Sequence, residues 1–434
     1  MSIVIVVLSI LFLSAIGYAI LRGCHLLSAK DNLIAIGASY GLGVGLVSAQ
    51  LYLYSLMYVP WEREFILIPW IVLFLFVLVK NRKRIKIVFP QISSWKRLDL
   101  LILLGMVLTV SYVIFEALLR PVVAWDAWAN WLMQAKVFFW EGMIRPDMLT
   151  YMESEYPLTI NLLGTFIYLM LGKVDDTVVL LTSTAFYLFL TITFFAALRK
   201  KYSLRYALLF TFLLMATQNF VRHGGRLEAG LADLPLGYFA FVSIVFLFEY
   251  FKKRTIQTLV LLTVFLSLTS LIKFEGIFLS VFIILCASVH IIRHKLYYQF
   301  LILGLWILPF ISWQFDRKVM DLQGSYSTNH GLEVSVDKTL HALSGTLKEL
   351  FNIKSWGLLW IMYFFSLFSF GIRSDKAVFV LNAIILSQFG LYLLIYNVTA
   401  WHNPESSIER LLMHIAPLVF YSLAIVVHNK IFRY

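Results

Sequence analysis

The sequence predicts an all-α integral membrane protein, a bundle of about 13 transmembrane helices. Of its 434 residues, 61% are hydrophobic and only 14% are charged, whereas soluble chains carry roughly 25% charged residues. The apolar residues form separate runs, and most of these approach the roughly 20 residues that a helix needs to cross a bilayer. Lys and Arg gather in alternate segments between the runs. A soluble fold could not bury this much apolar surface, but lipid solvates it directly.

The apolar runs divide the chain into two regions. Residues 1–97 carry three N-terminal spans of unknown role, and residues 98–434 carry the others. Two long segments between spans, 119–176 and 314–355, are predicted to lie outside the bilayer, and we call them the first and second outer loops. The predicted spans are 3–22, 33–58, 65–80, 99–118, 177–198, 206–220, 234–251, 257–272, 276–293, 298–313, 356–372, 377–397 and 411–428.

Basic residues predict the orientation, because loops rich in Lys and Arg stay in the cytoplasm. The clearest basic cluster lies within residues 80–97. This sorting places the N-terminus outside and the C-terminus inside. It also explains the net charge of +12 by topology, so no nucleic-acid partner is expected. The other basic segments are 199–205, 252–254, 293–295, 373–376 and 430–433. Most acidic residues fall on the predicted outer side, and the four exceptions on the cytoplasmic side are Asp31, Asp99, Glu249 and Asp375.

One apolar stretch, residues 157–172, conflicts with this alternation because it is nearly long enough to span. If it crossed the bilayer, the basic segment 199–205 would move outside and every later loop would invert. We therefore expect 157–172 to dip into the outer face without crossing, packed against other helices because irregular backbone is not tolerated in lipid.

An aromatic segment opens the first outer loop. Asp126 lies between Trp125 and Trp128, and Lys136 follows it. Asp126 is either the N-cap of an interfacial helix or a functional carboxylate. At helical spacing, one apolar stripe suited to the membrane interface contains Trp128, Trp131, Leu132, Ala135 and Phe139.

More charged and polar residues fall on the same predicted face, next to apolar spans. Charges in such places are costly, so each is a candidate for function. Taken singly, each fits a solvated turn or a helix cap, and that is our prediction for Asp175 and Glu409. Taken together, they predict a polar cavity that opens outward. Its further members are Glu153, Glu155, Tyr156, Arg222, His223, Arg226, Glu228, Asp233, Lys273, Glu275, His402 and Arg410.

Such a cavity suits group transfer from a lipid phosphate. A carboxylate can act as general base on an acceptor hydroxyl, and Arg or Lys can hold the leaving phosphate. Two outer carboxylates can alternatively share a divalent cation, Mg²⁺ or Mn²⁺, with the phosphate oxygens. The sequence contains no P-loop, zinc-binding spacing, hydrolase elbow or dinucleotide fingerprint. Its two cysteines form no disulfide framework.

Several motifs resemble the GT-C superfamily of membrane glycosyltransferases, which use polyprenyl-phosphate-linked sugars. The resemblance is closest to the bacterial branch with the 4-amino-arabinose, protein O-mannosyl and lipopolysaccharide-core transferases. It runs from about residue 98 to the C-terminus. It rests on Trp125-Asp126-Ala127-Trp128, Glu155-Tyr156-Pro157-Leu158, Ala232-Asp233-Leu234-Pro235, Lys273-Phe274-Glu275-Gly276, Trp401-His402 and Ser407-Ile408-Glu409-Arg410. The second motif lacks the family's second proline, and its Glu replaces the more usual Asp.

The resemblance implies a polyprenyl-phosphate-linked sugar as donor and an extracytoplasmic acceptor, at the outer face of a bacterial inner membrane. It implies Asp126 as the catalytic carboxylate, with Glu155 as its helper and Glu153 as the alternative helper. It also supports a non-crossing segment at 157–172. For the donor phosphate we expect Arg410 and Lys273, with Arg226 and His402 as weaker candidates; the alternative for Lys273 is a structural ion pair with Glu275 or Glu228.

Two other functions remain open from the sequence. A transporter or lipid-linked-sugar flippase would show paired repeats or helices broken near the middle of the membrane. The gathering of charges toward one side argues against that class. An inactive scaffold of an envelope-assembly complex would carry the same cavity without chemistry.

Overall fold

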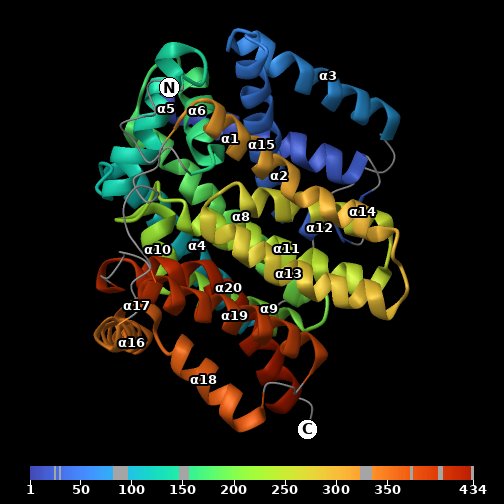
Figure 1. Cartoon of the computed structure of the whole chain (residues 1–434), viewed down its shortest axis with the longest axis vertical. Helices are drawn as coiled ribbons and strands as arrows, with labels where there is room; N and C mark the ends of the chain where they lie inside the picture. Colours follow the sequence, from blue (N-terminus) through green and yellow to red (C-terminus); the bar gives the residue numbers. More distant parts are fainter. Residues whose placement is uncertain are drawn as a thin grey trace.

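The computed structural model describes residues 1–23, 26–28, 31–81, 96–145, 156–322, 335–371, 375–398 and 404–431. In those residues every regular element is a helix, as Figure 1 shows. The sequence-based prediction of an all-α protein is therefore confirmed for the described part of the chain. The functional candidates Glu153, Glu155 and His402 lie outside the described residues.

Within the described ranges, nine helices are long and apolar enough to cross a membrane. Each coincides with a predicted span, so the helices of a multi-pass membrane protein are present. They are α1 (Ser2–Gly23), α2 (Asn32–Leu56), α4 (Arg97–Leu119), α7 with α8 (Asp176–Val179 and Leu181–Arg199), α11 (Asp233–Lys253), α13 (Phe274–Arg293), α14 with α15 (Gln299–Gly304 and Leu308–Val319), α19 (Lys376–Val398) and α20 (Ile408–Ile431).

The other four predicted spans take different forms, so the total of about 13 stays a prediction. Helix α3 (Arg63–Asn81) contains Pro69. Helices α12 (Ile256–Ser270) and α18 (Leu359–Phe370) are 15 and 12 residues long, or about 18–23 Å, which is less than the roughly 30 Å hydrocarbon core. The fourth, 206–220, consists of two helices.

The predicted span 206–220 is broken rather than continuous. Helix α9 (Leu204–Ala216) ends at Thr217, and α10 (Gln218–Gly225) continues at an angle of 67°. Thr217 has an extended backbone, with φ −66° and ψ 127°, and an extended residue interrupts the ladder of i to i−4 hydrogen bonds. The apolar run is interrupted at the same place by three polar residues, Thr217, Gln218 and Asn219.

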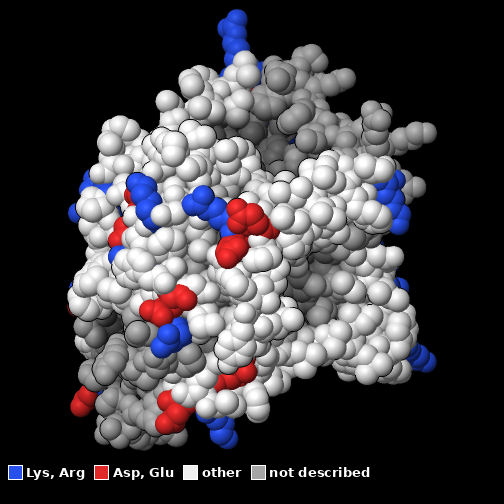
Figure 2. Space-filling view, turned by 90° about the horizontal axis from the view of Figure 1, so that it is seen from above, with Lys and Arg blue, Asp and Glu red and all other residues white. Residues whose placement is uncertain are grey.

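Helix α11 forms the centre of the bundle. It packs against α8, α12, α13 and α20, and nearly all its residues from Asp233 to Tyr250 are buried. By contrast, α4 exposes large apolar side chains, among them Leu101 and Leu108, at the surface. The surface in Figure 2 is mostly uncharged, with acidic and basic side chains in small groups. Exposed apolar area on this scale fits contact with lipid.

The two ends of α11 carry two separate groups of charges. At its C-terminal end, Lys253 and Lys200 bind the carboxylate of Asp31 at 2.9 and 2.5 Å, and both also bind Glu249. Burial raises the pKa of the Asp31 carboxyl, but the two lysines and Ser28 outweigh it and hold that pKa well below its ordinary value. We call this the Asp31 end, and the opposite end of α11 the Asp233 end.

The segment after α4 differs from the expected interfacial helix. It begins with a short π-helix, η3 (Ala127–Trp131), and continues as α5 (Leu132–Glu141). Trp131, Leu132 and Ala135, predicted to face the interface, are buried instead. Helix α6 (Thr159–Leu171) lies along them and donates hydrogen bonds from Asn161 and Thr165 to the carbonyls of Trp131 and Ala135.

Helix α6 itself corresponds to the stretch that we expect to dip into the outer face. Its 13 residues correspond to about 20 Å, which is too short to cross the hydrocarbon core unaided. It is buried against α5 and α2 along most of its length. Its position relative to a membrane stays a prediction.

Candidate functional site

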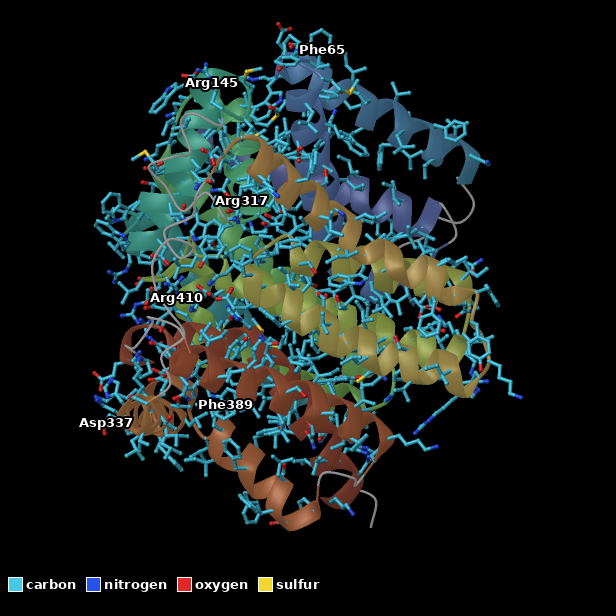
Figure 3. The ribbon with its side chains drawn as sticks, in the orientation of Figure 1. Phe65, Arg145, Arg317, Asp337, Phe389 and Arg410 are labelled. Atoms are coloured by element: carbon cyan, nitrogen blue, oxygen red, sulfur yellow. The ribbon has the colours of Figure 1, made fainter. Side chains whose placement is uncertain are left out.

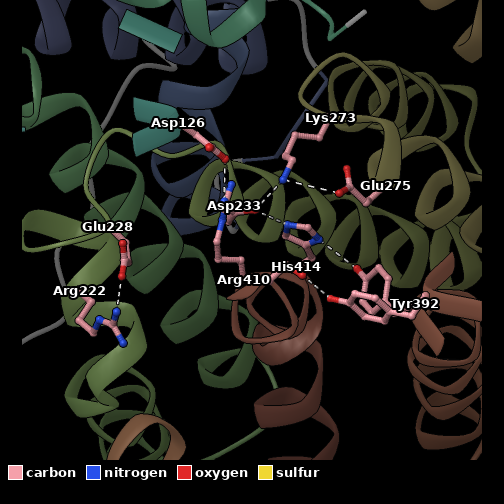
Figure 4. Close-up of polar contacts among 11 residues, drawn as sticks. Asp126, Arg222, Glu228, Asp233, Lys273, Glu275, Tyr392, Arg410 and His414 are labelled. Atoms are coloured by element: carbon pink, nitrogen blue, oxygen red, sulfur yellow. Dashed lines mark hydrogen bonds and ion pairs between the residues drawn. The ribbon is translucent and has the colours of Figure 1, made fainter. Parts of the chain in front are cut away.

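Asp233 is the centre of the candidate site, and its carboxylate is completely buried. Lys273 Nζ donates to Oδ1 at 2.9 Å, and His414 Nε2 lies 2.8 Å from the same oxygen. Arg410 Nε donates to Oδ2 at 2.9 Å. Figure 4 shows these three side chains converging on Asp233. A carboxylate removed from water needs such partners, because an unpaired buried charge costs several kcal/mol.

Three segments that are far apart in the sequence bring these groups together. Asp233 is the first residue of α11, where a negative charge interacts favourably with the helix dipole. Lys273 has an extended backbone and immediately precedes α13. Arg410 and His414 are four residues apart on α20, so they project from the same face of that helix. In Figure 3, Arg410 lies between the labelled Arg145 above it and Asp337 below it.

Arg410 lies between the buried carboxylate of Asp233 and the partly exposed carboxylate of Asp126. Its Nη1 lies 2.7 Å from Asp126 Oδ2. The exposed fraction of the side chain is 0% for Asp233, 24% for Arg410 and 31% for Asp126. Asp126 directly precedes the π-helix η3, and π-helical turns inside helices often occur at functional sites. Its side chain makes no capping hydrogen bond to that helix, so among the described contacts the ion pair takes the place of the expected cap.

Lys273 belongs to the buried side of the site. Only 3% of it is exposed, and its Nζ also lies 3.6 Å from Glu275 and 6.0 Å from the centre of the Tyr156 ring. Burial lowers the pKa of the Lys273 ammonium, but Asp233 and Glu275 outweigh that effect and raise this pKa above its ordinary value. The ammonium therefore stays charged at neutral pH, and its contacts are those of a structural ion pair.

His414 and Tyr392 complete the buried network. Nδ1 of His414 lies 3.0 Å from the hydroxyl of Tyr392, and both side chains are fully buried. Neither residue was predicted from the sequence. His414 has a signal that could have been used, since it is a polar residue one turn after Arg410 in an otherwise apolar run. Tyr392 has none, because tyrosines occur throughout the chain.

A second polar cluster lies beside the first. Arg222 binds Glu228 and also Glu409, the latter at 2.5 Å. Because Glu409 and Arg410 are neighbours in α20, the two clusters meet at the start of that helix. Arg226 turns toward Glu116 of α4 at 3.7 Å. His223 is buried, and within the described residues neither of its ring nitrogens has a hydrogen-bond partner.

The predicted site residues therefore divide into three groups. Asp126, Asp233, Lys273, Glu275 and Arg410 form one network, with Tyr156 beside it. Arg222, His223, Arg226 and Glu228 belong to the neighbouring cluster. Three others lie apart from both networks in the described part of the chain: Lys136 binds Asp176 at 2.6 Å, and Trp125 and Trp128 are exposed and in edge-to-face contact with each other.

The two residues predicted to be ordinary caps or turns differ in outcome. Asp175 is the N-cap of α7, where its side chain accepts from the amide of Val178, so that prediction is confirmed. Glu409 instead forms the ion pair with Arg222.

No cluster of three or more His, Cys, Asp or Glu side chains that could hold a metal ion occurs among the described residues. Comparison with family models, curated proteins and solved structures gives no significant match to this chain. Function is therefore argued from the geometry of the site.

The arrangement has two chemical capacities at its exposed edge. A guanidinium anchored on one side by a buried carboxylate presents its other side outward, where it can bind an anion such as a phosphate. The carboxylate of Asp126 lies next to it and can accept a proton. The ion pairs behind them hold Arg410 in one orientation.

Proposed function

We propose that this chain is a membrane glycosyltransferase that moves a sugar from a polyprenyl-phosphate donor to a hydroxyl of an extracytoplasmic acceptor. The observation that supports this best is the contact of 2.7 Å between Asp126 and Arg410 at the outward edge of a buried ionic network. It brings a proton acceptor and a phosphate-binding group to one place. The proposed location is the outer face of a bacterial inner membrane, with membrane lipid around the bundle.

In the proposed reaction, the acceptor hydroxyl oxygen attacks the anomeric carbon of the sugar. Asp126 takes the hydroxyl proton, assisted by Glu155 or Glu153. The bond between the anomeric carbon and the phosphate oxygen breaks, and polyprenyl phosphate leaves with the electron pair. Arg410 stabilises the charge that develops on the departing phosphate. Attack opposite to the leaving group inverts the configuration at the anomeric carbon.

Lys273 has a supporting role in this scheme rather than a direct one. It is nearly inaccessible and neutralises Asp233 and Glu275. Asp233, held by Lys273 and His414, fixes the Nε side of Arg410. We therefore assign phosphate binding to Arg410, and its positioning to Asp233 and Lys273.

The test is transfer of radiolabelled sugar by the purified protein in lipid vesicles, with a panel of polyprenyl-phosphate-linked sugars and envelope extract as acceptor. Mass spectrometry of envelope glycans and lipids, with and without the gene, identifies the acceptor to use. Asp126→Asn keeps the shape and removes the proton acceptor, so transfer should fall by about 10²- to 10⁴-fold. Full activity of a folded Asp126→Asn protein would refute the assignment of the base.

A second candidate function has one observation in its favour. The bend of 67° between α9 and α10 creates a broken helix beside the charged clusters, which is a feature of transporters. A flippase would move the labelled lipid across the vesicle membrane without breaking the bond between sugar and phosphate. Recovery of intact donor from the opposite leaflet, with no transfer product, would support that candidate.

A further inference from the structure

We infer that Asp126 and the donor phosphate compete for the same side of Arg410, so that donor binding releases the base. The inference rests on the proposed function and adds its order of events: donor first, then activation of the acceptor. In this structure the carboxylate of Asp126 binds Arg410 Nη1 from the outward side. A carboxylate presents to a guanidinium the same pair of oxygens as a phosphate does.

Two guanidinium nitrogens of Arg410 contact carboxylates, Nε that of Asp233 and Nη1 that of Asp126. Its Nε donates to Asp233, which is completely buried and is also in contact with Lys273 and His414. Turning the guanidinium away would leave the charge of Asp233 short of a partner in a buried site, which is costly. The side that carries Nη1 is the one next to the partly exposed Asp126. A phosphate that approaches Nη1 from the exposed side therefore meets the Asp126 carboxylate.

The net charge of the network also favours displacement of Asp126 by the phosphate. Three carboxylates, of Asp126, Asp233 and Glu275, face the two cations Lys273 and Arg410. With His414 counted as neutral, this leaves one excess negative charge. A phosphate added to such a group is repelled, and more strongly where water is excluded. Displacement of Asp126 from Arg410 removes the nearest carboxylate from the path of the phosphate.

Displacement also places the base where the reaction needs it. In the structure, Asp126 Oδ2 is 2.7 Å from the Nη1 atom that is to hold the phosphate. A carboxylate that gives up this contact stays close to the phosphate and to the sugar attached to it. While Asp126 Oδ2 is in contact with Arg410 Nη1, that oxygen is not free to accept the proton of the acceptor hydroxyl. Acceptor activation therefore follows donor binding rather than preceding it.

The experiment measures affinity for polyprenyl phosphate that carries no sugar, with the full chain in lipid nanodiscs. Asp126→Asn removes the competing charge, so the affinity should rise by about 2- to 5-fold, the scale of a partly exposed ion pair. Asp176→Asn is the matched control, because Asp176 is exposed to a similar extent, 33% against 31%, and pairs with Lys136 instead. Its affinity should equal that of the parent.

A second pair of variants isolates Arg410. In an Arg410→Gln background, the change Asp126→Asn should alter affinity by less than about twofold, because the two residues act through one contact. If Asp126→Asn fails to fold, Asp126→Ser removes the same charge and decides the question.

Two failures have different meanings. If the parent does not bind polyprenyl phosphate, the donor class in the proposed function is wrong. If the parent binds it and removal of the Asp126 charge leaves the affinity equal or weaker, the competition is wrong while the proposed function stands.

Discussion

At the scale of single residues, Asp233 and Asp126 show how one type of side chain serves two purposes. Both carboxylates bind Arg410, at 2.9 and 2.7 Å, but Asp233 is completely buried and Asp126 is partly exposed. The buried carboxylate of Asp233 is held by three partners, Lys273, Arg410 and His414. The exposed carboxylate has solvent beside it and can change partners at small cost. Position in the bundle, rather than the type of side chain, separates the anchor Asp233 from Asp126, the proposed base.

This difference predicts unequal effects of the same substitution. Asp233→Asn leaves Lys273 and Arg410 without their main counter-charge in a buried site, so it should destabilise the fold by about 3–5 kcal/mol. Asp126→Asn breaks a partly exposed pair and should cost about 1 kcal/mol or less. Thermal unfolding of both variants in detergent measures the difference. Equal shifts in Tm would show that Asp233 is not the anchor of the network.

The sequence predicted part of this site and not the rest. Charged residues next to apolar spans identified Asp126, Lys273 and Arg410, because charge beside lipid is rare enough to be informative. For Asp233 the sequence predicted only a lining role, since nothing in it shows that three cationic or polar groups converge on this carboxylate. That convergence depends on how α11, α13 and α20 pack, which a single sequence does not reveal.

At the scale of elements, hydropathy located the long helices of the described residues both where they are buried, as in α11, and where they are exposed, as in α4. It failed where packing decides the outcome. The run 206–220 was predicted as one span although it contains the polar residues Thr217, Gln218 and Asn219, and the backbone bends there by 67°. The stripe on η3 and α5 has the pattern of an interfacial helix, but α6 covers it. Periodicity identifies an apolar face and cannot distinguish a lipid neighbour from a protein neighbour.

Close packing of α1 on α2 gives a prediction at this scale. A Cβ atom added at Gly43 would lie 1.9 Å from the carbonyl oxygen of Leu13 on the neighbouring helix. Backbone cannot yield as a side chain does, so Gly43→Ala should destabilise the fold by about 1–3 kcal/mol. Gly390 of α19 is the control, because an added Cβ there meets nothing within 4 Å. Gly390→Ala should be neutral or slightly stabilising in the same unfolding measurement.

At the scale of the whole molecule, the two charged ends are separated by the length of one helix. Asp233 is the first and Lys253 the last residue of the 21-residue α11. Such a helix is about 32 Å long, close to the roughly 30 Å hydrocarbon core of a bilayer. We therefore predict that the lysines at the Asp31 end and the carboxylates at the Asp233 end lie on opposite sides of one membrane. Three of the four acidic residues predicted on the cytoplasmic side are paired with basic residues. Asp31 and Glu249 bind Lys200 and Lys253, and Asp99 binds Arg205.

Which end faces outward decides whether the proposed donor can reach the site, so orientation is the last prediction. From the basic segments we expect residues 80–97 in the cytoplasm and 126–156 outside. Single cysteines at Arg145 and Lys252, in a chain without Cys24 and Cys286, sample the two ends within the described residues. A membrane-impermeant maleimide added to intact cells should label position 145, and should label position 252 only after permeabilisation. The reverse pattern would place Asp126 and Arg410 on the cytoplasmic face, and the proposed transfer to an extracytoplasmic acceptor would be impossible there.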